Sequence, residues 1–220
     1  MTTRPEDKPL RADAERNRQL LLDAARELFA ERGLHVSLDD VAKQAGVGVG
    51  TAYRRFGSRS ELIEALFDER LDQMVALAAA CLEAEDPWTG LATFIERTCE
   101  IQASDRGLKE ILLGSVDGRE KVARIRERMR PLGEELVQRA KDAGALRPDF
   151  VPQDLPMIQI MLGGISDASR TVDPEIWRRY LSLVLIGIRA DPEPAPLASE
   201  SLDWDEMAEV LSCWRPPRRD

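Results

Sequence analysis

Apolar side chains follow the spacing of an α-helix along most of this 220-residue chain. Near the N-terminus they recur as i, i+3, i+4, i+7 and i+8, at Leu21, Ala24, Ala25, Leu28 and Phe29. A short helix is expected after Ser37, and a second short helix is expected to end at about Phe56. Longer helices are expected from Ser58 to about Glu83 and over residues 88–103, 106–113, 119–143, 153–169 and 174–190. No alternating pattern of the kind that a β-strand requires persists anywhere, and no internal repeat is present. The sequence therefore predicts an all-α protein.

Turn-forming and helix-breaking residues indicate where the parts of the chain begin and end. Ser37 and Ser58 are expected to cap helices, because Asp40 and Glu61 follow them at the spacing of a capping box. Pro131 should kink or divide its helix. We expect four segments: a flexible arm over residues 1–14, a three-helix domain over 15–60, a larger helical domain over 61–190, and a proline-rich linker with a short amphipathic helix over 191–220.

Charge is unevenly distributed along the chain, whose net charge is −9. Residues 1–60 carry a net charge of +2, and the remaining residues carry −11. A mildly basic N-terminal segment on an acidic body suits a nucleic-acid-binding head attached to a body that phosphate repels. Charge differences of this size are also common between segments with no nucleic-acid role. The charge pattern therefore indicates nucleic-acid binding only together with a sequence motif.

Several classes of protein are disfavoured by what the sequence lacks. No apolar run approaches the length of about 18 residues that a membrane span needs, and the polar N-terminus has no apolar stretch typical of a secretion signal. Cys81, Cys99 and Cys213 have neither metal-site nor disulfide spacing, so we expect buried thiols in a reducing cytoplasm, with a thiol switch as the alternative. His35 is the only histidine and has no partner at ligand spacing. We therefore expect no enzyme activity, no metal site and no cofactor.

The segment from Leu38 to Phe56 has the features of a helix-turn-helix. Ala42 lets a second helix cross the first closely, and Gly46 can take the positive φ that the turn requires. The second helix then carries Arg54 and Arg55 outward, and arginine forks bond to guanine edges or phosphates. The glycines from Gly46 onward superficially resemble a phosphate-binding loop. They lack its Gly-Lys-Ser/Thr ending and follow a helix rather than a strand, so nucleotide binding is disfavoured.

The run from Val41 to Phe56 resembles the DNA-binding domain of the TetR/AcrR family of regulators. Residues 21–33 resemble that family's first helix and residues 58–62 the start of its fourth, so the resemblance covers about 18–67. It implies phosphate contacts from Thr51, Tyr53 and Arg59 and major-groove contacts from Val49, Gly50, Arg54 and Arg55, and Ser37 and Gly48 complete the expected DNA-binding set. Gly48 departs from the family pattern, which often has a serine or another polar residue there. One cap or phosphate contact is therefore in doubt.

Two apolar stretches, residues 157–165 and 176–188, are too broad for a single buried helix face. A helix with two apolar faces lies either at the centre of a core or in an interface. The resemblance favours the interface, since TetR-like proteins dimerise through a four-helix bundle formed by their last two main helices, and Gly163-Gly164 would permit close approach. The resemblance also implies a small-molecule pocket in this domain. Candidate lining residues are Phe94, Ile111, Met129 and Met161, with ordinary core packing as the alternative.

The resemblance implies a helix-turn-helix DNA-binding domain followed by a C-terminal helical domain for ligand binding and dimerisation. We expect a cytoplasmic homodimer that represses transcription from a palindromic operator in double-stranded DNA until an unidentified small-molecule effector releases it. The alternative is a helical protein-interaction adaptor with a vestigial DNA-binding head, and salt-sensitive binding to duplex DNA discriminates the two. A small all-helical enzyme is a third interpretation, which the lack of any nucleophile–base pair or cofactor motif disfavours.

Overall fold

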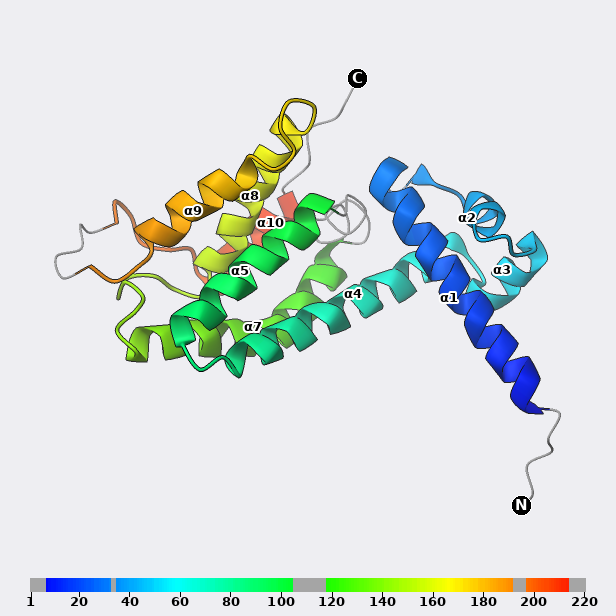
Figure 1. Ribbon diagram of the computed structural model, residues 1–220, viewed down its shortest axis with the longest axis horizontal. Coiled ribbons are helices and arrows are strands. Elements are labelled where there is room, and N and C mark those ends of the chain that lie inside the picture. The colour runs from blue at the N-terminus through cyan, green and yellow to red at the C-terminus, as the bar shows by residue number, and fades with distance from the viewer. Residues whose placement is uncertain (1–6, 33–34, 105–117, 192–196, 214–220) are drawn as a thin grey trace, which may run out of the picture. The chain divides into compact units, whose positions relative to one another are not determined.

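A computed structural model describes residues 7–32, 35–104, 118–191 and 197–213 (Figure 1). These residues form helices joined by turns, and the only β-type pairing among them is one antiparallel bridge between Leu146 and Arg189. The predicted all-α fold is therefore confirmed. The described residues divide into two compact units, an N-terminal unit that ends at Arg70 and a C-terminal unit that begins at Leu71.

The N-terminal unit contains α1 (Asp7–Arg32), α2 (Leu38–Gln44), α3 (Val49–Phe56) and the first half of α4 (Arg59–Leu82). All four helices contribute to its core, with buried side chains at Leu21, Leu22, Ala25, Phe29, Val41, Ala42, Ala52, Phe56, Leu62 and Phe67. Residues 7–14 belong to α1, whereas the sequence predicted a flexible arm over residues 1–14. Because α1 packs against both α2 and α3, it holds these two short helices in place.

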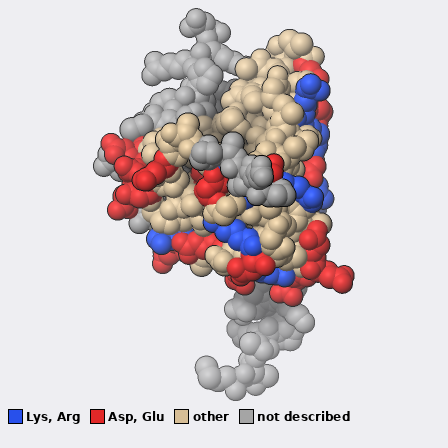
Figure 2. All heavy atoms as spheres, turned by 90° about the vertical axis from the view of Figure 1, so that its left-hand side faces the viewer, with Lys and Arg blue, Asp and Glu red and all other residues tan. Residues whose placement is uncertain are grey.

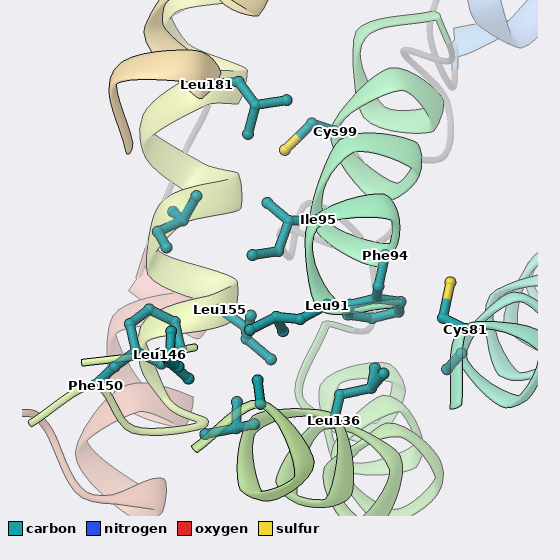
Figure 3. Packing of buried hydrophobic residues seen from close by; sticks show 14 of the residues in the cluster. Cys81, Leu91, Phe94, Ile95, Cys99, Leu136, Leu146, Phe150, Leu155 and Leu181 are labelled. Atoms are coloured by element: carbon teal, nitrogen blue, oxygen red, sulfur yellow. The ribbon is translucent and has the colours of Figure 1, made fainter. Parts of the chain in front are cut away.

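The C-terminal unit contains the rest of α4, α5 (Pro87–Ser104), α7 (Gly118–Asp142), α8 (Asp154–Ser169), α9 (Trp177–Gly187) and α10 (Trp204–Cys213). α5 packs against α7 and α8, and α8 packs against α9. Figure 3 shows the resulting core, where Leu91, Phe94 and Ile95 of α5 lie among apolar side chains of the neighbouring helices. The helix predicted over residues 106–113 lies outside the described residues.

Pro131 lies within α7, which runs without a break from Gly118 to Asp142. Of the two effects predicted for Pro131, division of the helix is therefore wrong, and a kink stays a prediction. A proline inside a helix removes one donor and leaves the carbonyl four residues earlier without its partner. Pro131 and Glu127 are both exposed, so water can bond to the carbonyl that is left over.

The C-terminal segment packs on the body through α10, which contacts α7. Met207 is buried there, and the Arg130 guanidinium lies 4.9 Å from the centre of the Trp204 ring. α9 begins at Trp177, three residues later than predicted, because residues 174–176 form a turn closed by i+3 hydrogen bonds. No helix among the described residues combines the length and apolar character that crossing a membrane requires.

Candidate nucleic-acid interface

The start of α2 and the turn that leads from it to α3 are built by local features that the sequence predicts. The Ser37 hydroxyl accepts a hydrogen bond from the Asp40 amide at 3.1 Å, and the Asp40 carboxylate accepts one from the Ser37 amide at 3.2 Å. This capping box begins α2. Gly46 then turns the chain with φ of 65°, a conformation that costs a side-chain-bearing residue about 1–2 kcal/mol. The predicted cap and the predicted glycine turn are both confirmed.

α3 has one buried face and one exposed face. Ala52 and Phe56 are buried against the other helices, whereas Val49 is 43% exposed and Tyr53 is 46% exposed. Arg54 and Arg55 are also exposed. The helix therefore presents two cations, a phenol and an apolar side chain on the surface, as expected for a helix that contacts DNA.

Gly48 is the N-cap of α3 and makes no side-chain cap. Its carbonyl accepts hydrogen bonds from the amides of Thr51 and Ala52, at 2.8 and 3.1 Å. A Cβ added to Gly48 meets only the Thr51 hydroxyl, at 3.8 Å. There is therefore space at Gly48 for the serine that the family pattern often has there. Without that serine, the first amides of α3 lack a side-chain oxygen as hydrogen-bond acceptor.

The two recognition-helix arginines have different partners. Arg54 stays on its own helix, where its Nε donates to the Gly50 carbonyl at 3.2 Å and its guanidinium donates to the Thr51 hydroxyl at 3.0 Å. The guanidinium of Arg55 instead contacts the Glu15 carboxylate of α1 at 3.1 Å. Arg54 is thus paired with neutral acceptors, whereas Arg55 is paired with a negative charge.

Tyr53 also has an acidic neighbour. Its hydroxyl hydrogen bonds to the Asp39 carboxylate of α2, which raises the pKa of Tyr53 above its ordinary value. The phenol is therefore neutral at physiological pH and available as a donor to a phosphate oxygen, provided that it leaves Asp39.

Arg59 and Ser37, two further members of the predicted DNA-binding set, also have structural roles. The Nε of Arg59 donates to the Val36 carbonyl at 2.8 Å, which ties the start of α4 to the loop before α2. The Ser37 hydroxyl is used in the capping box. At the start of α4 the Glu61 amide donates to the Ser58 hydroxyl at 3.2 Å, as predicted. Gly50 and Val49 are exposed in the first turn of α3, beside Thr51.

The structure places two of the four candidate pocket residues in the same core and a third on the surface. Phe94 is buried in the core of the C-terminal unit, and Met129 packs partly buried against the same core. Met161 is 48% exposed, because the buried face of α8 is formed by Leu155, Ile158 and Leu162. Met161 therefore does not lie with Phe94 around a common interior site, and Ile111 lies outside the described residues.

Sequence reasoning missed one buried polar group in this core. Gln102 is only 6% exposed, and its Oε1 has no hydrogen-bond partner among the described residues. One turn earlier on α5, the Thr98 hydroxyl receives a hydrogen bond from Gln159 of α8 at 2.9 Å. We call Thr98, Gln102 and Gln159 the polar strip, and a ligand donor could satisfy the Gln102 acceptor, which has no donor among the described residues.

Cys81 and Cys99 are buried thiols, whereas the side chain of Cys213 lies outside the described part of the chain. Cys81 and Cys99 are free and buried, and burial raises the pKa of Cys99 to about 12. Its thiol therefore stays protonated and unreactive. No group of three or more His, Cys, Asp or Glu side chains in the described ranges is placed to hold a metal ion.

An exposed apolar face lies on α8 and α9. Its members are Met161, Tyr180, Leu183 and Ile186, of which Leu183 is 56% and Ile186 is 72% exposed. Figure 2 looks onto the C-terminal unit, and charged side chains are sparse in the upper part of that view. A cluster of large apolar side chains left in water is typical of a protein–protein interface.

Comparisons with known proteins agree with this geometry. The sequence profile described as "Bacterial regulatory proteins, tetR family" matches residues 21–66, and one described as "Transcriptional regulator SbtR-like, C-terminal domain" matches residues 86–190. An HTH-type transcriptional regulator of Staphylococcus aureus is 40% identical over 81 residues, which is 36% of this chain and 42% of that protein. The chain thus spans less than half the length of this curated relative.

Solved structures extend the similarity to both units. The TetR transcription regulatory protein of Mycobacterium vanbaalenii is 30% identical, with a TM-score of 0.62 over 83% of this chain and 100% of that one. FadR of Bacillus subtilis, solved in complex with stearoyl-CoA, is 21% identical and shares the fold, with a TM-score of 0.61 over 77% of this chain and 98% of its own. This chain therefore belongs to the TetR family of bacterial transcriptional regulators.

Proposed function

We propose that this DNA-binding regulator is a homodimeric repressor that reads a palindromic operator and is released by a small molecule. The observation that carries the proposal is the outer face of α3, where Tyr53, Arg54 and Arg55 stand exposed on a helix held by α1 and α2. Arginine on such a helix contacts guanine N7 and O6, and a tyrosine hydroxyl contacts phosphate. Thr51, Val49 and Gly50 would face the same groove, and Ser37, Gly48 and Arg59 would lie beside the phosphates.

Dimerisation is supported by the apolar face of α8 and α9. Leu183 and Ile186 are 56% and 72% exposed on the same helix, so a second copy of the chain would have apolar surface to cover. Gly164 is exposed and a side chain added there meets nothing within 4 Å, which leaves room for close helix approach. A two-fold dimer would present two copies of α3 to successive major grooves, about 34–36 Å apart. That spacing is the physical reason for expecting a palindrome.

Ligand release is supported by the core of the C-terminal unit. The polar strip of Thr98, Gln102 and Gln159 lies among apolar side chains, so the proposed effector is a mainly apolar molecule with one donor group for Gln102. Phe94, Met129 and Ile111 stay candidates for its apolar surroundings. FadR, which shares the fold, was solved in complex with stearoyl-CoA, a molecule with a long apolar acyl chain.

Coupling between effector and operator needs a ligand with different affinities for two conformations of the dimer. α4 contributes residues to both units, so it is the proposed element through which a change in one reaches the other. Repression is the simplest result of binding to the operator, which is located in the bacterial cytoplasm. A reporter gene downstream of the operator tests this directly, since a repressor lowers expression and an activator raises it.

The experiment that tests DNA reading is selection of bound sequences from a random duplex pool, followed by affinity measurements on the recovered sequence. We expect a palindrome whose binding falls by about 1–3 kcal/mol, roughly 5- to 150-fold, for Arg54→Ala. Lys43→Ala, which removes a positive charge from the exposed face of α2, is the control. Folded protein that recovers no consensus at low salt would overturn the proposal and favour a protein-interaction adaptor with a vestigial head.

A further inference from the structure

Glu15 of α1 lies 40 residues before Arg55 in sequence and contacts it in space. The Glu15 carboxylate is 3.1 Å from the Arg55 guanidinium and 3.9 Å from that of Arg18. Both Glu15 and Arg55 are exposed, so neither side chain is held there by burial. The pair therefore forms on the surface that α3 presents to solvent, where DNA phosphates would otherwise be the partners of Arg55.

The pairing sets Arg55 apart from Arg54. Arg54 donates to a carbonyl and a hydroxyl of α3, and no carboxylate among the described residues pairs with its positive charge. Arg55 has its charge compensated by a carboxylate from another helix. Tyr53 shows the same arrangement, since its hydroxyl bonds to the Asp39 carboxylate of α2. Two of the three recognition side chains are thus occupied by acids that belong to the scaffold.

We propose that Glu15 is a specificity-determining residue, which positions Arg55 and screens it from phosphate so that the arginine is released mainly to a base edge. A phosphate that takes Arg55 must break the ion pair and bring a second negative charge close to Glu15, which like-charge repulsion opposes. A guanine edge offers two neutral acceptors, N7 and O6, in bidentate geometry and adds no negative charge. Glu15 therefore disfavours non-specific contacts more than specific ones. This inference rests on the proposed role of α3 as the reading helix.

The test compares Glu15→Gln with Glu27→Gln at two DNA sequences. Glu27 is a matched control because it lies on the same helix and pairs with neutral Gln44 of α2 at 3.3 Å, away from Arg55. Affinities are measured for the selected operator and for a scrambled duplex, each over a range of salt concentrations. Unfolding curves of the variants confirm that the fold is intact.

We expect Glu15→Gln to bind the scrambled duplex about two- to fivefold more tightly, the range that loss of an exposed ion pair permits. The slope of log affinity against log salt should steepen by about 0.9 for each additional phosphate that the variant neutralises. The operator affinity should rise less, so the ratio of operator to scrambled binding falls. Glu27→Gln should change both affinities by the same factor, and in an Arg55→Ala background Glu15→Gln should do no more than Glu27→Gln.

Two results would overturn the inference. If Glu15→Gln weakens operator binding without strengthening scrambled binding, Glu15 assists the specific contact and does not screen. If it raises both affinities equally, as Glu27→Gln is expected to do, its effect is that of net charge alone. A wild-type protein with no preference for any sequence refutes the proposed function instead, and the scrambled-duplex arm still shows whether Glu15 restrains Arg55.

Discussion

The helices α3 and α9 are both short and both have one buried face, yet their outer faces carry opposite chemistry. α3 is fixed through Ala52 and Phe56 and exposes Arg54 and Arg55. α9 is fixed through Trp177 and Leu181 and exposes Leu183 and Ile186. The charged outer face of α3 is well solvated, so it is stable without a bound anionic partner. The outer face of α9 is unfavourable to expose to water, which supports the proposed dimer contact there.

The two helices are also placed by different kinds of contact. α3 follows the short helix α2, whose start is capped by Ser37 and Asp40, and the turn at Gly46. α9 is placed by the core of the C-terminal unit, whose members come from helices far apart in sequence. We infer that the reading surface depends on local backbone geometry and that the assembly surface depends on long-range packing. Substitutions in the two regions should therefore differ in size and in what they disturb.

Trp177→Ala should have the largest effect, because it removes the largest fully buried side chain and leaves a cavity in the C-terminal core. We expect the free energy of unfolding to fall by about 3–5 kcal/mol. Denaturant unfolding followed by circular dichroism measures this. The exposed Arg179 of the same helix provides the control, and Arg179→Ala should change stability by less than about 0.5 kcal/mol.

A second variant at this position tests the packing argument more closely. The indole Nε1 of Trp177 is buried and has no hydrogen-bond partner in the described residues. Trp177→Phe keeps most of the ring and removes that unsatisfied donor, so it should destabilise far less than Trp177→Ala. A phenylalanine variant as unstable as the alanine variant would show that packing volume is not the main contribution of Trp177.

Leu183→Glu combined with Ile186→Glu should have the next largest effect, because it places two charges on the apolar face of α9. A central interface side chain contributes about 2 kcal/mol or more, so the dimer dissociation constant should rise at least about 30-fold. Analytical ultracentrifugation measures the oligomeric state, and affinity for the palindrome should fall in parallel. Ala79→Glu adds a charge at an exposed position of α4 and should leave the dimer intact. A double variant that stays dimeric would remove the contrast between α3 and α9.

The sequence predicts the head in more detail than the body, and particular residues show why. The caps at Ser37 and Ser58 and the turn at Gly46 depend on residues at most three or four positions apart, and the structure confirms all three. The contact between Glu15 and Arg55 has no local signal, since it depends on how α1 crosses α3. The DNA contacts assigned to α3 by family resemblance stay predictions.

In the body, helical periodicity predicts which segments form helices and leaves their rotation and neighbours open. Met161 illustrates this limit, because α8 is apolar on two sides and only the packed structure shows which side faces the core. Pro131 is a further example. Local rules expect a proline to interrupt a helix, yet α7 continues through it because the carbonyl that loses its donor lies on an exposed side.

Gly46→Ala tests the local geometry of the head. A side chain added at Gly46 meets nothing within 4 Å, so its cost comes from the φ of 65° alone, about 1–2 kcal/mol of unfolding free energy. Gly50→Ala is the same chemical change at another open glycine, but in the first turn of α3, where alanine is favoured by up to about 1 kcal/mol. We expect opposite signs in thermal unfolding. If both variants are equally stable, the α2–α3 turn does not depend on the left-handed conformation at Gly46.

Ser37→Ala should have a smaller effect. It removes the N-cap oxygen of α2 and should lower the unfolding free energy by about 1 kcal/mol. Ser60→Ala, in the first turn of α4, is the control and should change stability by less than about 0.5 kcal/mol. Affinity for the operator separates the two roles of Ser37, because a hydroxyl that also contacts phosphate would lose DNA binding beyond what the control loses.

The capping box formed by Ser37 and Asp40 should also affect how the stability of the protein depends on pH. Hydrogen bonds from the side chain and the amide of Ser37 hold the pKa of Asp40 below its ordinary value of 3.8. The stabilisation is fully present above the unfolded-state pKa and is lost as pH falls through the lower pKa of the folded state. Wild-type stability should therefore decrease more steeply below about pH 4 than that of Ser37→Ala, which has lost one of these bonds. Parallel acid titrations of the two proteins, followed by circular dichroism, measure the difference. If the two titration curves are parallel, the capping box does not contribute to the acid sensitivity of the head, and the contrast between local and long-range placement rests on Gly46 alone.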